Sequence, residues 1–246
     1  MIGRFKYGDE VVYGEVAGER VIVNKMLYSD TFLFSDLELL PPSDPSKIIC
    51  VGLNYRDHAL ELNMPVPETP IIFLKPKSAV TGHLGNIVYP GMTHQLEYEG
   101  ELAIIIGKRC KNINASDAKS VIMGYTCFND VTARDLQKKD TQWTRSKSFD
   151  TFAPVGPFIA EPSLDTSDLP IKTRVNGKIR QDSSTSNLIF DVPRLIEFIS
   201  CIMTLEKGDI IATGTPPGVG ELFVGDQVEI EIEGIGVLKN SVVAQE

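Results

Sequence analysis

Short apolar runs bounded by turn residues recur along the chain and predict strands. From residue 47 onward, most of these runs are flanked by Gly, Pro, Asn or Asp, and they lie at 47–53, 70–75, 85–90, 101–107, 152–160, 169–181, 209–214 and 226–243. The Asn-Gly pair in "VNGK", 175–178, predicts a hairpin turn inside the sixth run. This pattern is typical of a β protein.

Helical periodicity is confined to a few segments. It occurs at 55–63, 116–124 and 192–203, and Asp191 and Pro193 supply a cap and a first-turn proline for the last of them. Strands and helices do not alternate regularly, and the chain has no internal repeat. A doubly wound nucleotide-binding sheet is therefore excluded, and we expect a mainly β fold with a few helices.

The first 45 residues are expected to form a small β-rich unit. Between residues 5 and 24, strand-like segments such as "VVYGEV" and "RVIVN" alternate with turn signals at "YGDE" and "VAGER". The segment "LLPPSDPSK", 39–47, concentrates Pro, Ser and Asp and is typical of a linker. We predict a small N-terminal domain at 1–45 and a larger domain at 46–246.

Composition and charge narrow the choice of partners. The 246 residues carry a formal net charge of -9, whereas nucleic-acid binding relies on clustered Lys and Arg. Small molecules or metal ions are the partners to expect. No apolar run reaches the roughly 20 residues of a membrane helix, and "MIGRFKYGDE" lacks the apolar core of a signal peptide. We therefore expect a protein that binds no membrane. The four cysteines form no C-x-x-C pair, which suits a reduced, cytoplasmic protein.

Three glutamates, Glu97, Glu99 and Glu101, stand at alternate positions in "LEYEGELAIII", 96–106. In a β-strand, alternate side chains share one face, and like charges this close repel unless water or a cation separates them. Hard divalent cations such as Mg²⁺ and Mn²⁺ prefer oxygen ligands. The triplet therefore predicts either a solvated strand face or part of a cation site.

Asp130 is a candidate for a further cation ligand. It follows the strand-like stretch "YTCFN", and strand ends are where ligands are commonly presented. The alternative is that its carboxylate caps a helix in "VTARDLQ", 131–137. The two interpretations differ in what the carboxylate oxygens contact.

His58 and Glu61 are spaced three residues apart in the predicted helix at 55–63, so they are neighbours on its surface. A carboxylate beside an imidazole fixes its tautomer and stabilises the imidazolium, as a general base requires. The alternative is an exposed pair on a surface helix.

Two further segments could contact an anion. Lys147, in "TRSKSFDTF", could neutralise a carboxylate or an enolate, or it could be a solvated surface lysine. The Gly- and Thr-rich "ATGTPPGVG", 212–220, exposes backbone N–H groups and hydroxyls that can hold an anionic oxygen. A tight hairpin turn is the alternative, and the segment is not a phosphate-binding P-loop.

The order of these motifs resembles the fumarylacetoacetate hydrolase family. The series is "GLNYRDHALE", "FLKPKSA", "EYEGELAIIIGK", "NDVTARDLQ", "SKSFDTFAPVGP", "RVNG" and "GDIIATGTPPGVG", and it runs from about Lys47 to the C-terminus. The resemblance implies a mixed β-sandwich roll, usually a homodimer, with a divalent metal in the active site. The compact bacterial 2-hydroxyhepta-2,4-diene-1,7-dioate isomerases and the acylpyruvase-like members are the nearest comparison.

The resemblance also implies roles for individual residues. The matches to the metal carboxylates are Glu99, Glu101 and Asp130, and the match to the catalytic dyad is His58 with Glu61. The matches to groups that contact the substrate or its oxyanion are Lys147, Gln137, Thr215 and Gly214. Glu97 departs from the pattern, since relatives commonly carry Asp there and do not use it as a ligand. "CVGLN" lacks the additional metal carboxylate that some members have before the histidine.

The expected function follows from the same resemblance. It is a divalent-metal-dependent enzyme, using Mg²⁺ or Mn²⁺ with Ca²⁺ as a further candidate, that acts on a small 2-oxo acid. The first expectation is hydrolysis of a C–C bond in an acylpyruvate or fumarylpyruvate, in which His58 activates water. Isomerisation of a 2-hydroxydienoate and decarboxylation of an oxaloacetate-type acid remain open at the same site. A non-catalytic protein that binds a metal or an oxo acid is the alternative of another class.

Overall fold

The structure is a computed structural model that describes residues 1–24 and 29–246. Its strands are β1 (Ile2–Tyr7), β2 (Glu10–Ala17), β3 (Arg20–Asn24), β4 (Ser29–Leu33), β5 (Glu38–Leu40), β6 (Ile48–Gly52), β7 (Ile71–Lys75), β8 (Val80–Thr81), β9 (Asn86–Tyr89), β10 (Leu96–Tyr98), β11 (Gly100–Ile106), β12 (Ile122–Asn129), β13 (Thr132–Ala133), β14 (Ala153–Ala160), β15 (Pro170–Val175), β16 (Lys178–Ser184), β17 (Ile210–Ala212), β18 (Gly220–Glu221), β19 (Gln227–Ile232) and β20 (Gly236–Ala244). The α-helices are α1 (Arg56–Glu61), α2 (Arg134–Lys139), α3 (Thr144–Lys147) and α4 (Val192–Ile202). Short 3₁₀ turns are η1 (Phe34–Asp36), η2 (Lys77–Ala79), η3 (Ala115–Val121) and η4 (Thr185–Asn187).

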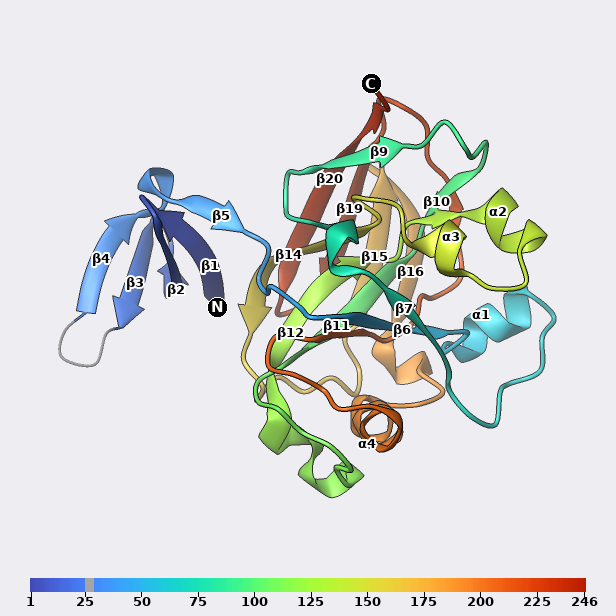
Figure 1. The fold of residues 1–246 in the computed structure, drawn as a ribbon, viewed down its shortest axis with the longest axis horizontal. Helices are drawn as coiled ribbons and strands as arrows, with labels where there is room; N and C mark the ends of the chain where they lie inside the picture. Colours follow the sequence, from blue (N-terminus) through green and yellow to red (C-terminus); the bar gives the residue numbers. More distant parts are fainter. Residues whose placement is uncertain (25–28) are drawn as a thin grey trace.

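Within the described residues, the strands form three sheets (Figure 1). The largest has the order β4-β3-β2-β1-β14-β12-β11-β17-β6-β7, with β5 beside β1 and β8 beside β14. The second has the order β16-β15-β19-β20-β9, and the third has the order β13-β10-β18. Pairing is antiparallel except between β17 and β6, β14 and β8, and β20 and β9. The sheet pairing therefore joins segments that lie far apart in the sequence.

The main core lies where the second sheet packs against β11, β12 and β14 of the largest. Buried Leu102 and Ile104 of β11 belong to the same apolar cluster as Ile230 and Ile232 of β19. Helix α4 adds its apolar side to this cluster. The predicted mixed β-sandwich with a few helices is confirmed.

Helix α4 forms as its sequence predicts. The Asp191 carboxylate accepts a hydrogen bond from Arg194 N, and Pro193 occupies the first turn, where its missing N–H costs nothing. Leu195, Ile196 and Ile199 are buried at helical spacing. The hairpin between β15 and β16 likewise turns at Asn176 and Gly177, which both have positive φ.

Two predicted helices differ in the structure. The segment predicted as a helix at 116–124 is the 3₁₀ turn η3 followed by the first residues of β12. The helix expected at 131–137 begins only at Arg134, after the short strand β13. At the first place, the apolar residues Ile122 and Met123 fit a helical period but belong to β12.

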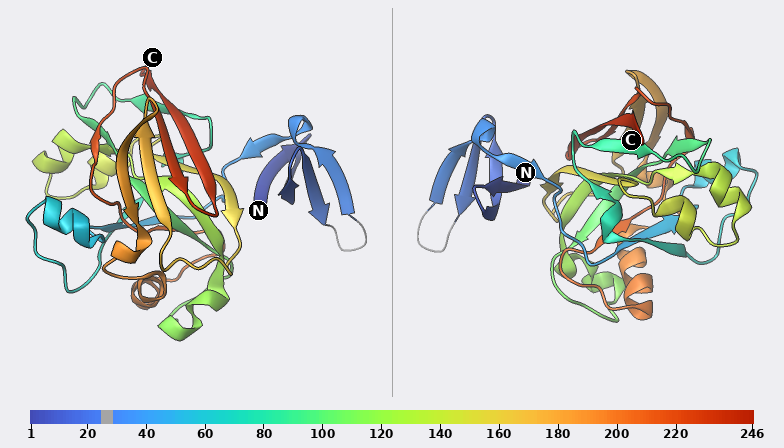
Figure 2. Two further views of the ribbon diagram at one scale, coloured as in Figure 1. Left: turned by 180° about the vertical axis from the view of Figure 1, so that it is seen from behind. Right: turned by 45° about the horizontal axis from the view of Figure 1, so that its top comes forward.

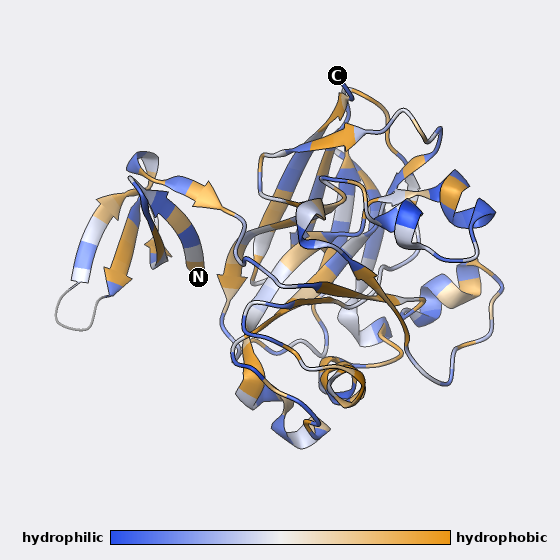
Figure 3. Cartoon of the chain, viewed as in Figure 1, coloured by the Kyte–Doolittle hydropathy of each residue, from blue (hydrophilic) through white to orange (hydrophobic). Residues whose placement is uncertain are grey.

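The N-terminal strands β1–β5 stand to one side of the larger body, and β1 reaches it by pairing Ile2 with Ile159 of β14 (Figures 1 and 2). Their own core contains Phe5, Val21 and Val23. The alternation of hydrophobic and hydrophilic residues along these strands is visible in Figure 3. The predicted domain 1–45 includes residues 25–28, which lie outside the described part, and its boundary stays a prediction.

The segment expected to be a linker is anchored on both sides. Residues 38–40 form β5, and Ser43, which is buried, donates a hydrogen bond to Gly208 O at 2.5 Å. In the described ranges, no helix has the combined length and apolar character of a membrane span. The four cysteines are free thiols, as their spacing predicts.

Candidate active site

A cavity of about 350 Å³ is lined in part by residues of α1, α2 and α3. These helices lie on the side of the larger body away from the N-terminal strands (Figures 1 and 2). Acidic, basic and apolar side chains share the lining of the cavity. The apolar part of the lining is Val51, Leu53, Leu62, Met64, Ile71, Phe73 and Trp143. Trp143 packs edge-on against Phe73, with ring centroids 5.2 Å apart. The polar part contains most of the residues that the sequence singles out.

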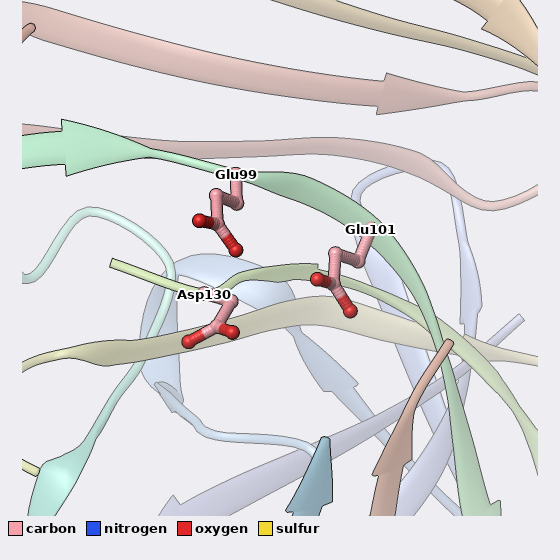
Figure 4. A group of neighbouring side chains, drawn as sticks. All are labelled: Glu99, Glu101 and Asp130. Atoms are coloured by element: carbon pink, nitrogen blue, oxygen red, sulfur yellow. The ribbon is translucent and has the colours of Figure 1, made fainter. Parts of the chain in front are cut away.

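Glu99, Glu101 and Asp130 converge on one place in this cavity (Figure 4). Each offers a carboxylate oxygen, and these oxygens lie within 4.8 Å of one another. All three side chains are buried. Asp130 therefore joins the two glutamates, and the alternative that it caps a helix is wrong, because α2 begins at Arg134 and has no side-chain cap.

The register of two strands brings the three acids together. β11 and β12 are antiparallel neighbours in which Gly100 pairs with Asn129. Glu99 and Glu101 flank Gly100, and Asp130 directly follows Asn129. The ends of the two strands are held together by hydrogen bonds from Asp130 N to Glu99 O and from Glu99 N to Asn129 Oδ1.

Gly100 is required between the two glutamates for a steric reason. A Cβ at this position would lie 2.2 Å from Thr173 Oγ1 and 3.1 Å from Gln181 Oε1 on the neighbouring sheet. Only glycine allows β11 to approach β15 and β16 this closely.

The acidic triplet spans two strands and the residue between them, Glu99. Glu97 belongs to β10 of the small sheet, whereas Glu101 belongs to β11 of the large sheet, so a single strand does not carry all three. Glu97 and Glu99 still lie on one side, because the Arg134 guanidinium pairs with both, with Nε 2.7 Å from Glu97 Oε2. Glu97 is thus neutralised by a cation of the chain itself.

Cationic side chains compensate two of the three clustered carboxylates. Lys147 Nζ lies 2.9 Å from Glu99 Oε2 and 2.7 Å from Asp130 Oδ2, and Lys75 Nζ lies 2.5 Å from Asp130 Oδ1. Burial by itself raises the pKa of Glu99, but the charges of Lys147 and then Arg134 outweigh it and lower that pKa to about 2. Glu99 is therefore ionised over the whole physiological range.

Glu101 has a different environment. Its Oε2 accepts a hydrogen bond from Gly214 N at 2.8 Å, and the structure gives it no ion pair with a residue of the described ranges. Burial, and then the charges of Asp130 and Glu99, raise the pKa of Glu101 well above its usual value. A divalent cation at this point would remove that repulsion.

The donor set fits a hard divalent cation. It consists of carboxylate oxygens alone, on backbone held by the strand register, and oxygen ligands of this kind suit Mg²⁺, Mn²⁺ and Ca²⁺. Three protein ligands would leave room for a substrate or water, as a catalytic metal requires.

His58 and Glu61 form an ordered pair beside the carboxylates. His58 lines the cavity and is 8% exposed, and its Nδ1 lies 2.8 Å from Glu61 Oε2. Glu61 Oε1 accepts a hydrogen bond from Gly218 N at 3.1 Å. Because Glu61 is held on its other side, it can keep the imidazole in one orientation. The alternative of an exposed pair on a surface helix holds for Glu61, whose side chain is 42% exposed, but not for His58.

The expected substrate contacts are partly gathered in the cavity. Lys147, Gln137 and Thr215 line it, and Lys147 is 2% exposed, so it is no surface lysine. Gly214 does not line the cavity; its N–H donates to Glu101, and its φ is +98°. The segment 213–219 connects β17 and β18, which do not pair with each other, so it is not a hairpin turn.

Two cationic residues of the site escaped sequence reasoning. Arg134 lines the cavity and contacts Glu97, Glu99 and Gln137. Lys75 is 1% exposed and donates to Val131 O and Phe152 O as well as pairing with Asp130. The signal for Lys75 was its place at the end of the apolar run "PIIFLK", which is expected to be buried. The signal for Arg134 was its place three residues before Gln137, one turn away on α2.

Comparison with known proteins identifies the family. Residues 47–243 match the model of the fumarylacetoacetate (FAA) hydrolase C-terminal domain. The chain belongs to the fumarylacetoacetate hydrolase family. The family resemblance predicted from the ordered motifs is confirmed.

Three proteins similar to this family member have names that describe a reaction. The oxaloacetate tautomerase YisK of Bacillus subtilis is 47% identical over 89% of this chain and 77% of its own. The crystal structure of 5-carboxymethyl-2-hydroxymuconate delta-isomerase from Mycobacterium smegmatis is 45% identical, with a TM-score of 0.91 over 100% of this chain and 99% of that one. Maleylpyruvate hydrolase from Sphingobium sp. SYK-6, in complex with manganese(II) and pyruvate, is 31% identical, with a TM-score of 0.83 over 100% and 99% of the two chains. Family members thus include tautomerases, isomerases and hydrolases.

Proposed function

We propose that this protein is a divalent-cation-dependent enzyme that enolises small 2-oxo acids, with isomerisation or tautomerisation as the reaction. The observation that carries the proposal is that the carboxylates of Glu99, Glu101 and Asp130 and the imidazole of His58 line one cavity, with Glu61 paired to His58 behind it. A relative that binds manganese and pyruvate, itself a 2-oxo acid, supports both the cation and the substrate class.

The ligands in this proposal are Glu99, Glu101 and Asp130. A bound Mg²⁺ or Mn²⁺ would supply Lewis-acid polarisation of the substrate carbonyl. Within the cavity, Lys147 and Arg134 add positive charge that stabilises the negative charge developing on the substrate oxygen.

His58 is the proposed general base. When Nδ1–H donates to Glu61 Oε2, the other ring nitrogen, Nε2, is left with a free lone pair. It can take a proton from the carbon beside the carbonyl and deliver it to the enolate oxygen, which gives the enol, or to another carbon, which moves the double bond. The Glu61 carboxylate stabilises the imidazolium formed in between.

Hydrolysis is the second candidate. The same imidazole could deprotonate a water that attacks a distal carbonyl, as the sequence analysis expects. The similar proteins named for tautomerisation and isomerisation are 47% and 45% identical to this chain, whereas the maleylpyruvate hydrolase is 31% identical. This difference favours proton transfer as the first candidate. Decarboxylation of an oxaloacetate-type acid stays a third prediction at the same site.

A substrate panel with product identification tests the proposal. Purified protein is incubated with Mn²⁺ or with chelator, together with enol-oxaloacetate, a 2-hydroxydienedioate and an acylpyruvate. Cation-dependent interconversion of the first two without cleavage supports the enolisation reading, and release of pyruvate from the third supports hydrolysis. A melting temperature that rises with Mn²⁺, without turnover of any compound, would instead identify a non-catalytic cation-binding protein.

A further inference from the structure

We infer that Gln181 is a positioning residue of this site, which joins the carboxylates to the catalytic dyad through one loop. The inference rests on the proposed function of the cavity, and it concerns a side chain that does not line it. Gln181 lies on β16, is 1% exposed, and reaches the loop 213–218, called here the glycine-rich loop.

The glycine-rich loop touches both halves of the site. Gly214 N donates to Glu101 Oε2 at 2.8 Å, and Gly218 N donates to Glu61 Oε1 at 3.1 Å. Between these two contacts, Thr215 lines the cavity. A displacement of this loop would therefore move a proposed cation ligand and the partner of the proposed base together.

Gln181 uses its amide oxygen and both amide N–H groups to hold this loop against β11. Its Oε1 accepts from Gly100 N at 3.0 Å, and its Nε2 donates to Thr215 Oγ1 and to Pro216 O, both at 2.8 Å. One amide thus connects the backbone between the two metal glutamates with two successive residues of the loop. No apolar side chain of the same size could replace these three bonds.

The bond to Thr215 also decides how that hydroxyl can bind a substrate. Thr215 Oγ1 donates its single proton to Gly100 O at 3.0 Å while it accepts from Gln181 Nε2. To accept a hydrogen bond from Thr215, an incoming carboxylate must replace Gly100 O as the acceptor of this hydroxyl. Gln181 keeps the oxygen in place during the exchange, because its own N–H remains bonded to Oγ1.

The backbone of β16 supports the loop at its other end. A Cβ on Gly218 would lie 2.2 Å from Arg180 O, so the loop and the strand are in direct contact there. Tyr98 Oη donates to Gly218 O at 2.8 Å from the opposite side. Loss of the Gln181 amide would release the middle of the loop while these end contacts remain.

The test compares Gln181→Met with a matched control, Asn240→Leu. Asn240 is also a buried amide, 2% exposed, and donates from Nδ2 to two backbone carbonyls, Gly82 O and Gly85 O, away from the cavity. Hydrogen exchange of the full-length protein is followed without cation or substrate. We expect amides of the glycine-rich loop to exchange about tenfold faster in Gln181→Met and at the wild-type rate in Asn240→Leu.

Kinetics with the panel compound that the wild type converts give the second readout. Gln181→Met should raise KM about tenfold, and combining it with Thr215→Val should raise KM no further than Thr215→Val alone, because both act through one hydroxyl. Additive effects, or loop exchange equal to that of Asn240→Leu, would overturn the inference. If the wild type converts nothing, the proposed function fails, and the hydrogen-exchange comparison still decides whether Gln181 holds the loop.

Discussion

Glu97, Glu99 and Glu101 occupy equivalent positions in the sequence pattern but have different partners in the fold. Arg134 neutralises Glu97 and shares Glu99 with Lys147. Among the residues that the structure describes, Glu101 is held only by Gly214 N, and its pKa is raised. Alternation could predict that the three share a side. It could not predict which of them lacks a compensating cation, because that depends on residues distant in the sequence.

The different partners predict different effects of neutral substitutions. Glu101→Gln and Asp130→Asn should each weaken Mn²⁺ binding by more than about 100-fold, because each removes a charged ligand. Glu97→Gln should change it by no more than about threefold. The measurement is Mn²⁺ titration followed by electron paramagnetic resonance, and an equal loss in Glu97→Gln would show that the ligand set is wrongly assigned.

A substitution at His58 should affect catalysis but not cation binding. His58→Ala should lower kcat by roughly 10²–10⁴-fold, the range typical of a general base, and leave Mn²⁺ affinity unchanged. His94→Ala is the matched control, since this histidine is exposed and lies outside the cavity lining. Steady-state rates equal to wild type in His58→Ala would remove the dyad from the mechanism.

The sequence indicates the residues of the proposed site that belong to local motifs, but not those that reach it from distant parts of the fold. His58 and Glu61 are one helical turn apart, so their pairing is visible in the sequence. Lys75 reaches Asp130 from 55 positions away, and Gln181 reaches Gly100 from 81 positions away. Such contacts follow from strand order, which no local spacing reveals.

At the scale of elements, apolar runs predicted most strands of the large domain and failed where two elements adjoin. Val121 and Ile122 are both buried in the main core, but the first ends η3 and the second begins β12. A short apolar run satisfies both periods, so only the tertiary contacts decide between turn and strand. The turn at Asn176–Gly177 was predicted correctly because positive φ at both residues is a local requirement.

Asp209 joins two elements and predicts a pH-dependent loss of stability. It precedes β17, and its buried carboxylate accepts from Ser46 N and Oγ, Lys47 N and Glu206 N, and pairs with Lys47 Nζ at the start of β6. Burial raises the pKa of Asp209, but the hydrogen bonds from Lys47, Glu206 N and Ser46 outweigh burial and lower it. Asp209→Asn should cost about 1.5–3 kcal/mol of unfolding free energy at neutral pH.

The sign of the pH dependence follows from the lowered pKa. A depressed carboxyl pKa stabilises the fold above the unfolded value of about 3.9 and loses this effect as the pH falls toward the folded value. Urea unfolding should therefore show a wild-type advantage over Asp209→Asn that is largest above about pH 5 and shrinks below about pH 4. The exposed control Asp182→Asn should differ from wild type by less than about 0.5 kcal/mol at any pH, and a constant difference for Asp209→Asn would contradict the ionic account.

At the scale of the whole molecule, the cavity and every proposed ligand lie within residues 51–215. The N-terminal strands contact the larger body through the Ile2–Ile159 pairing and through Phe34, whose ring packs edge-on against Phe158 at 6.3 Å. Removal of the predicted N-terminal domain should therefore affect the stability of the fold but not the binding of a cation in the cavity. The expected homodimer likewise stays a prediction, which sedimentation of the full chain would test.

A chain of residues 46–246 should fold and bind Mn²⁺ with the affinity of the full protein. Its melting temperature should be lower, because β14 loses its pairing with β1 and Gly208 O loses the Ser43 hydroxyl. Calorimetry with and without Mn²⁺ measures both quantities. An unfolded product, or a folded one without Mn²⁺ affinity, would show that the site needs the first 45 residues.

In the proposed site, Glu99, Glu101 and Asp130 hold a divalent cation to which a 2-oxo acid binds. The most direct measurement is an anomalous difference map from crystals of the protein soaked with Mn²⁺ and pyruvate. We expect one Mn²⁺ peak per chain among these three carboxylates, with pyruvate beside it in the cavity near Lys147. A map in which that position holds no Mn²⁺, or in which the peak lies on Glu97 instead, would contradict this proposal.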